Sequence, residues 1–187
     1  AHVRKGTSGK PKESNSHPFQ NKNWIFAHNG SVERGSLLNY LKQEYKNCIE
    51  GETDSEVYFY LIMQCIENAN NDVIAGIKDA IKIVKGSDCT GLNFLLSDGR
   101  CLYALRYAER NANYYSLYYL ERRPSGNGTF EGGSQETGLL LKSKSLNGEK
   151  AVLVCSEKLS EEKWKEINSG KLIIINSDLK IDEKDVI

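Results

Sequence analysis

The chain centres on the nonapeptide Trp24-Ile25-Phe26-Ala27-His28-Asn29-Gly30-Ser31-Val32. Its apolar first half is typical of a buried β-strand, and Asn-Gly is the dipeptide that most readily adopts positive φ. We therefore predict that the strand ends at a corner formed by Asn29 and Gly30. Such a corner presents a side-chain amide and a backbone N–H together, which suits a developing negative charge. A hairpin turn that happens to contain Asn-Gly is the alternative.

Length and composition are those of one globular domain. The 187 residues are 39% hydrophobic and 27% charged, so the chain is long enough to bury a core and is not of the disordered class. The 25 basic and 25 acidic side chains balance, and the basic ones are scattered along the chain. We therefore expect no nucleic-acid partner and no membrane partner, and no apolar run reaches the roughly 20 residues of a membrane span.

The cysteines are odd in number, widely spaced and without a C-x-x-C pair. This pattern is typical of reduced, mostly buried thiols, so we expect a cytoplasmic protein without a secretory signal. We also expect packing roles for all five, which are Cys48, Cys65, Cys89, Cys101 and Cys155.

Hydrophobic periodicity predicts helices first and strands later. The helices are expected over 33–48, 53–66 and 72–85, with Thr53 or Asp54 as the N-cap of the second. The clearest hairpin joins 92–96 to 101–107 through the turn Ser97-Asp98-Gly99. Further predictions are the end of a strand at 1–4, strands at 114–120, 139–142, 151–154 and 172–175, a flexible loop at 126–138 and a short helix at 160–167. No repeat or linker divides the chain, so we predict a single domain over 1–187.

Polar residues of complementary chemistry gather in the first third of the chain. An arginine can bind a carboxylate through two hydrogen bonds, and an aspartate can pair with an ammonium, so together they can bind an amino acid. The Asn29 amide and the Gly30 N–H can bind an oxyanion at the far end of that ligand, which makes glutamine the obvious candidate. The other members of this set are Arg4, Thr7, His17 and Asp54.

Each of these residues also has a purely structural interpretation. Arg4 can be a surface cation, Asp54 only a helix N-cap, and His17 a loop histidine bonded to backbone. The three histidines, His2, His17 and His28, can in principle form a zinc site. No spacing typical of zinc ligands supports that alternative, so we expect no metal.

Four motifs resemble those of class II glutamine amidotransferases, in the same order and at similar separations. The later stretches 91–99 and 155–157 look like the stand-alone branch of this family, which lacks a fused synthase. The resemblance covers essentially the whole chain and is most specific over residues 1–60. The four motifs are Ala1-His2-Val3-Arg4-Lys5-Gly6-Thr7, Asn15-Ser16-His17-Pro18-Phe19, Phe26-Ala27-His28-Asn29-Gly30 and Glu52-Thr53-Asp54-Ser55-Glu56.

The resemblance implies an α+β Ntn-hydrolase fold, a four-layer αββα sandwich with two antiparallel sheets. It also implies hydrolysis of the glutamine side-chain amide to glutamate and ammonia through a cysteinyl thioester, without a cofactor. By similarity, Arg4 holds the α-carboxylate, Thr7 and His17 shape that pocket, and Asp54 takes the α-ammonium. Asn29 and Gly30 form the oxyanion hole.

The chain departs from the family pattern at the nucleophile. The family uses a cysteine at the mature N-terminus, whose own α-amine serves as base, whereas residue 1 here is alanine. We therefore expect the larger, C-terminal part of such a protein, with the cysteine and the N-terminal strands upstream. The expected partners are glutamine or another γ-glutamyl compound, an ammonia-accepting synthase, or an N-terminal segment of the same protein.

Three other functions stay open at this point. The same pocket would suit a hydrolase of γ-glutamyl amides or peptides. A native N-terminus without cysteine would instead favour a non-catalytic homologue that binds an amino acid or regulates a partner. A zinc hydrolase that uses the three histidines would need bound metal.

Overall fold

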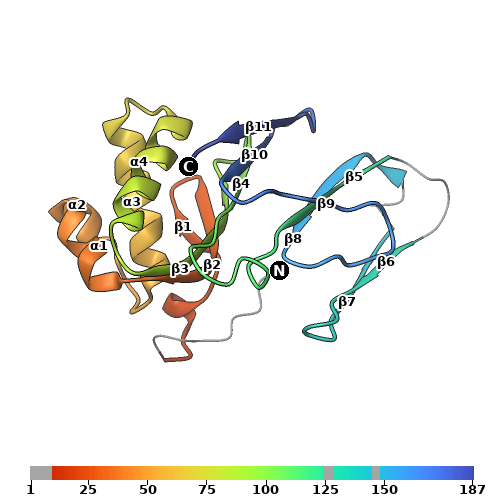
Figure 1. Ribbon diagram of the computed structural model, residues 1–187, viewed down its shortest axis with the longest axis horizontal. Coiled ribbons are helices and arrows are strands. Elements are labelled where there is room, and N and C mark those ends of the chain that lie inside the picture. Colours follow the sequence, from red (N-terminus) through yellow and green to blue (C-terminus); the bar gives the residue numbers. More distant parts are fainter. Residues whose placement is uncertain (1–9, 124–128, 145–147) are drawn as a thin grey trace.

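The computed structural model describes residues 10–123, 129–144 and 148–187, and the structural statements below concern these residues. The described chain contains four α-helices and three antiparallel sheets (Figure 1). The helices are α1 (Arg34–Tyr40), α2 (Gln43–Lys46), α3 (Asp54–Asn68) and α4 (Val73–Lys85), after the 3-10 helix η1 (Glu13–Asn15).

The largest sheet has six strands in the order β1-β2-β3-β4-β10-β11, and every neighbouring pair is antiparallel. A three-stranded sheet, β8-β5-β9, and a hairpin, β6-β7, complete the fold. The strands are β1 (Phe19–Asn21), β2 (Trp24–Val32), β3 (Cys89–Ser97), β4 (Leu102–Arg106), β5 (Tyr118–Arg122), β6 (Phe130–Gly133), β7 (Leu140–Ser143), β8 (Ala151–Cys155), β9 (Lys165–Glu166), β10 (Lys171–Ile175) and β11 (Ile181–Asp185).

The two faces of the six-stranded sheet carry different layers. The helices lie along one face, and the three-stranded sheet lies away from them (Figure 1). A second apolar cluster joins the large sheet, through Ala104 and Ile173, to the small sheet, through Tyr119 and Val152. This α+β arrangement of helices and two packed antiparallel sheets agrees with the predicted fold class.

Helix α3 is the centre of the main core. Thr53 Oγ1 accepts a hydrogen bond from the Glu56 N–H at 3.3 Å, so the predicted N-cap is confirmed. Every residue from Asp54 to Ile66 is buried, as the nearly all-round apolar sequence predicts. Helix α4 approaches closely because Gly76 has no side chain: a Cβ there would lie 2.5 Å from the Ile66 backbone.

The helix predicted over 33–48 is wrong, because it is two helices separated by a break. The break comes from the side chain of Gln64, which is buried in α3. Its Oε1 accepts from the Lys42 N–H at 2.7 Å, and its Nε2 donates to the Tyr40 carbonyl at 2.9 Å. Both backbone groups would otherwise take part in helical hydrogen bonds, so a distant side chain replaces the helix at this point.

Two predictions for the second half of the chain are also wrong. Residues 160–167 form no helix: β9 pairs with β5, and the Ile167 N–H donates to the Leu117 carbonyl at 2.9 Å. The supposed loop at 126–138 contains β6, which pairs with β7, and its Phe130 is buried beneath the guanidinium of Arg122. Tertiary contacts override local propensity in both segments. Residues 1–4 and 126–128 lie outside the described part of the chain.

Most of the other predicted strands are confirmed. The 92–96/101–107 hairpin is confirmed as β3 and β4, and the strands near 139, 151 and 172 are confirmed as β7, β8 and β10. The strand predicted at 114–120 starts only at Tyr118. Strands β1 and β11 were not predicted, because both lie in polar stretches without alternating apolar residues.

A buried arginine ties the large sheet to the loop after β4. The Arg106 Nη1 donates to the Ile167 carbonyl at 2.6 Å and to Glu166 Oε1 at 2.7 Å. Its Nη2 donates to the Ala112 carbonyl at 3.2 Å, and its Nε to the Tyr115 carbonyl at 3.1 Å. The guanidinium thus uses its planar set of donors to satisfy three carbonyls of irregular backbone.

Replacing Arg106 should therefore destabilise the fold. We expect Arg106→Leu to lower the free energy of unfolding by about 2–4 kcal/mol, because carbonyls that now accept from a buried cation lose their partner. Urea denaturation measures this change. The matched control is Arg110→Leu, which removes an exposed ion pair with Asp88 and should cost at most about 0.5 kcal/mol. Equal effects of the two variants would contradict the role assigned to Arg106.

Candidate functional site

Four of the six predicted site residues lie in the described part of the chain. They are His17, Asn29, Gly30 and Asp54, whereas Arg4 and Thr7 lie outside it. Asn29 and Gly30 belong to β2, and Asp54 is the first residue of α3. The structure brings β2 and α3 together, so predicted site residues that are distant in sequence lie on two neighbouring elements.

The corner predicted at Asn29 and Gly30 is wrong, because β2 continues through it to Val32. Its pairing with β3 shifts register between Gly30 and Val32, which is the signature of a β-bulge. Gly30 has φ +154°, so its positive φ bends the strand instead of ending it. Within the bulge, the Ser31 N–H donates to Thr90 Oγ1 at 3.1 Å.

Gly30 also permits a very close approach of β3. A Cβ at Gly30 would lie 1.8 Å from the carbonyl oxygen of Gly91, and a Cβ at Gly91 would lie 2.6 Å from the ring of Tyr115. No side chain fits at either position. The two glycines therefore fix the path of the backbone at the predicted oxyanion site.

Asn29 faces away from the helices. Its neighbours Phe26 and His28 point into the main core and are buried, whereas Asn29 is exposed. This alternation follows from the two-residue period of a strand. The Asn29 side chain is therefore exposed on the side of the sheet opposite the helices, where a ligand can reach it.

Asp54 is joined directly to the bulged strand. Its Oδ2 accepts a hydrogen bond from the Val32 N–H at 2.9 Å, and the residue is buried. Val32 is two residues beyond Gly30, so this bond fixes the position of the carboxylate relative to the bulge. The structure therefore places the predicted ammonium-binding residue against β2, two residues along the strand from Gly30.

His28 makes a second connection between the same elements, one that the sequence analysis missed. Its Nε2 lies 3.2 Å from the Gly91 carbonyl, and its Nδ1 lies 3.0 Å from Ser55 Oγ. A carbonyl only accepts, so Nε2 carries a hydrogen and Nδ1 accepts from the Ser55 hydroxyl. This buried histidine therefore holds the carbonyl that packs against Gly30. The available signal was the pair of polar residues, His28 before Asn-Gly and Ser55 after Asp54.

His17 lies in the loop that leads into β1. Its ring packs edge-on against Phe19, with the ring centroids 4.8 Å apart. Phe19 pairs with Phe26 of β2 in an antiparallel register. The residues before Phe19 therefore run alongside β2 in the direction of His28. The contact with Phe19 does not join His17 to the other predicted site residues, so its place in the predicted pocket stays a prediction.

The described residues show no metal-binding cluster of histidine, cysteine and carboxylate side chains. His28 uses both ring nitrogens in protein hydrogen bonds, and His2 lies outside the described part. None of the described helices is long and apolar enough to cross a bilayer.

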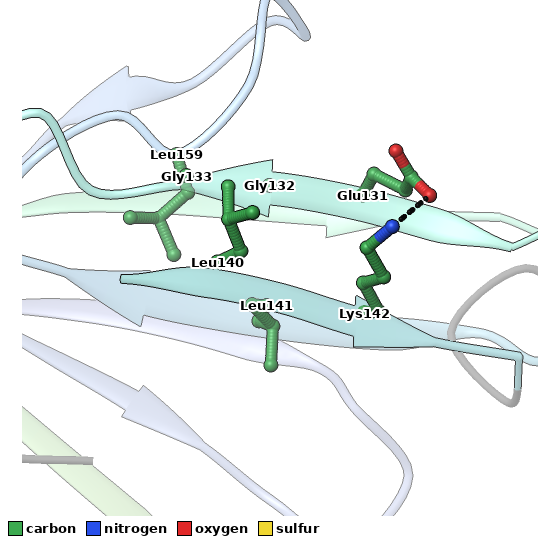
Figure 2. A pocket seen from close by; sticks show the side chains of 7 residues that line it. All are labelled: Glu131, Gly132, Gly133, Leu140, Leu141, Lys142 and Leu159. Carbon is green, nitrogen blue, oxygen red and sulfur yellow. Dashed lines mark hydrogen bonds and ion pairs between the residues drawn. The ribbon is translucent and has the colours of Figure 1, made fainter. Parts of the chain in front are cut away.

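Two surface hollows lie away from these residues. One, of about 240 Å³, runs along the β6–β7 hairpin between Gly132, Gly133 and Leu140 (Figure 2). Figure 2 also shows the 2.9 Å ion pair between Glu131 and Lys142 at its edge. The other, of about 580 Å³, is lined by the small sheet and by β10 and β11. Neither contains a predicted site residue.

The cysteines are not arranged as a nucleophilic centre. Burial raises the pKa of the Cys65 thiol to about 11 and that of the Cys155 thiol to about 11, and it also raises the pKa of Cys89. These thiols therefore stay protonated at neutral pH. The expectation that all five pack in the interior is wrong for Cys48, which is exposed because it follows the short surface helix α2.

Comparison with known proteins identifies the family. The model of the family described as "Glutamine amidotransferases class-II" matches residues 1–182. The chain therefore belongs to the class-II glutamine amidotransferases. A solved glutamine aminotransferase class-II domain protein from Silicibacter pomeroyi is similar to it, with a TM-score of 0.66 and 27% identity, over 90% of this chain and 70% of that one.

Two curated relatives match part of the chain. The chain is 40% identical over 77 residues to the probable glutamine amidotransferase DUG3 of Saccharomyces cerevisiae, covering 38% of this chain and 22% of that protein. It is 37% identical over 92 residues to glutamine–fructose-6-phosphate aminotransferase of Streptococcus agalactiae, covering 46% of this chain and 14% of that enzyme. The matched regions thus span less than a quarter of either relative.

A glycine substitution tests the close approach of β2 and β3. We expect Gly30→Ala to lower the free energy of unfolding by at least about 3 kcal/mol, because the new Cβ would overlap the Gly91 carbonyl. Gly99→Ala is the control: Gly99 also has positive φ, but no atom lies within 4 Å of its Cβ position. That variant should cost only about 1 kcal/mol. Thermal unfolding of both proteins makes the comparison, and equal losses would refute the packing explanation.

Thiol reactivity tests the burial of the cysteines. A pKa of about 11 leaves about 0.1% thiolate at pH 8, against roughly a quarter for an ordinary thiol. We expect iodoacetamide at pH 8 to modify Cys48 first, and Cys65 and Cys155 at least about 50-fold more slowly. Peptide mass spectrometry over a time course measures the rates. Rapid modification of Cys65 in the folded protein would contradict this assignment.

Proposed function

We propose that this domain binds glutamine and hydrolyses its side-chain amide to glutamate and ammonia through a cysteinyl thioester. The observation that carries the proposal is the 2.9 Å hydrogen bond between Asp54 Oδ2 and the Val32 N–H. It sets an anion suited to an ammonium beside the bulge that carries Asn29 and Gly30. These groups match the two ends of glutamine.

In the proposed complex, Asp54 accepts hydrogen bonds from the α-ammonium, and Arg4 binds the α-carboxylate. Thr7 and His17 shape the pocket around that carboxylate. The Asn29 side-chain amide and the Gly30 N–H donate to the amide oxygen as it becomes negative. The exposure of Asn29 on the side of the sheet opposite the helices supports this role.

We propose that the nucleophile is a cysteine upstream of residues 1–187, which would form one glutamine amidotransferase domain together with it. Its thiolate attacks the amide carbon, and the tetrahedral oxyanion is held by Asn29 and Gly30. The C–N bond then breaks, and the nitrogen takes a proton from the α-ammonium of that cysteine and leaves as ammonia. Water hydrolyses the thioester to glutamate. The raised pKa values of buried Cys65 and half-buried Cys155 support a nucleophile other than these two thiols.

The complete domain, with its upstream cysteine, acts as a glutaminase or passes ammonia to a synthase that accepts it. We place it in the cytoplasm, on the ground of its odd number of widely spaced cysteines. It uses no cofactor.

An assay of ammonia release tests the proposed activity in the full-length protein as the cell makes it. We expect Asn29→Ala to lower kcat for glutamine by about 10²–10³-fold with little change in KM, because its donor acts mainly in the transition state. Asp54→Asn should instead raise KM, because the ammonium loses its anionic partner. No ammonia from glutamine, with release from a γ-glutamyl peptide, would show the alternative hydrolase. Binding of glutamine without turnover would indicate a non-catalytic homologue.

A further inference from the structure

We propose that Asn15 and Glu56 are positioning residues for the substrate ammonium, an inference that rests on the proposed function. Together they hold the backbone of residues 50–52, just before Asp54. We call these two side chains and the three backbone N–H groups they bind the Asn15–Glu56 clasp. The clasp fixes the position of Asp54 relative to the loop that contains His17.

Glu56 binds the first two N–H groups of the clasp. Its carboxylate is buried, with Oε1 accepting from the Glu50 N–H and Oε2 accepting from the Gly51 N–H, both at 2.8 Å. Its own N–H donates to the N-cap Thr53. A buried carboxylate is costly unless its oxygens are bonded, so this side chain has a narrow choice of positions. It also lies in the first turn of α3, where the helix dipole favours a negative charge.

Asn15 binds the third N–H group from a different segment of the chain. The residue is 0% exposed, and its Oδ1 accepts from the Glu52 N–H at 2.8 Å. Its Nδ2 donates to the Lys10 carbonyl at 2.9 Å and to Glu52 Oε2 at 3.3 Å. A Cβ at Gly51 would lie 2.6 Å from Asn15 Oδ1, so the turn and the asparagine are in direct contact.

The clasp connects two parts of the proposed pocket. Asn15 lies two residues before His17, and Glu56 lies two residues after Asp54. Three successive backbone N–H groups donate hydrogen bonds to two buried side chains, so the turn is already ordered before a ligand binds. Binding then loses less conformational entropy, and the Asp54 carboxylate meets the ammonium in a fixed place.

The test compares two ligands that differ only in the ammonium. They are L-glutamine and 4-carbamoylbutanoate, which has the same amide and carboxylate but no α-amino group. The ratio of their dissociation constants reports the contact with Asp54. It is measured by calorimetry with the full-length protein, with the nucleophilic cysteine replaced by serine so that glutamine is not consumed.

The two clasp variants are Asn15→Ser and Glu56→Gln, and either one can carry the test if the other does not fold. We expect each to weaken L-glutamine binding about tenfold and to leave binding of 4-carbamoylbutanoate within about twofold. Glu52→Gln is the matched control. Its side chain is 55% exposed, and the variant keeps an acceptor for Asn15 while removing the ion pair with Lys12, so both constants should stay unchanged.

Two results would overturn the inference. Equal weakening of both ligands by folded clasp variants, or no weakening of either, would show that Asn15 and Glu56 do not act through the ammonium. If the protein with the unsubstituted clasp binds neither ligand, the proposed function itself is wrong, and the positioning role is wrong with it. A selective loss of L-glutamine affinity supports both.

Discussion

The structure depends on the contact between the first turn of α3 and the bulge of β2. Asp54 accepts from the Val32 N–H, and Ser55 bonds His28, which in turn holds the Gly91 carbonyl against Gly30. Two consecutive residues of α3 thus hold the bulge, Asp54 directly through β2 and Ser55 through His28 and the carbonyl of β3. Because the bulge leaves backbone groups without ladder partners, these side chains are needed to satisfy them.

The same contact explains why polar residues are tolerated at the centre of the core. Helix α3 is buried from Asp54 to Ile66, and an unpaired polar group there would be costly. Glu56 binds the preceding turn and Gln64 the break between α1 and α2, whereas the buried Tyr58 hydroxyl has no hydrogen-bond partner among the described residues. Glu56 and Gln64 each fix the path of another segment, so the helix organises the loops around it as well as the apolar core.

Local sequence patterns predicted well those elements that local interactions determine. The N-cap at Thr53, the amphipathic helix α4 and the β3–β4 hairpin all follow from periodicity and turn residues. Patterns failed where a remote partner decides the conformation. Gln64 breaks the helix predicted over 33–48, and pairing with β5 makes part of 160–167 extended. The predicted corner became a bulge because β3 continues to pair with β2 beyond Gly30.

The sequence by itself determined the family motifs, the chemical types of the site residues and the positions of most regular elements. Only the tertiary structure decided that Asp54 lies beside Val32, that His28 supports the bulge, and that Asn15 reaches the turn before Asp54. The physical reason is the separation of the partners along the chain. Hydrogen bonds across 22, 37 or 63 residues leave no periodic pattern, and they form only when packing of the apolar core brings the segments together.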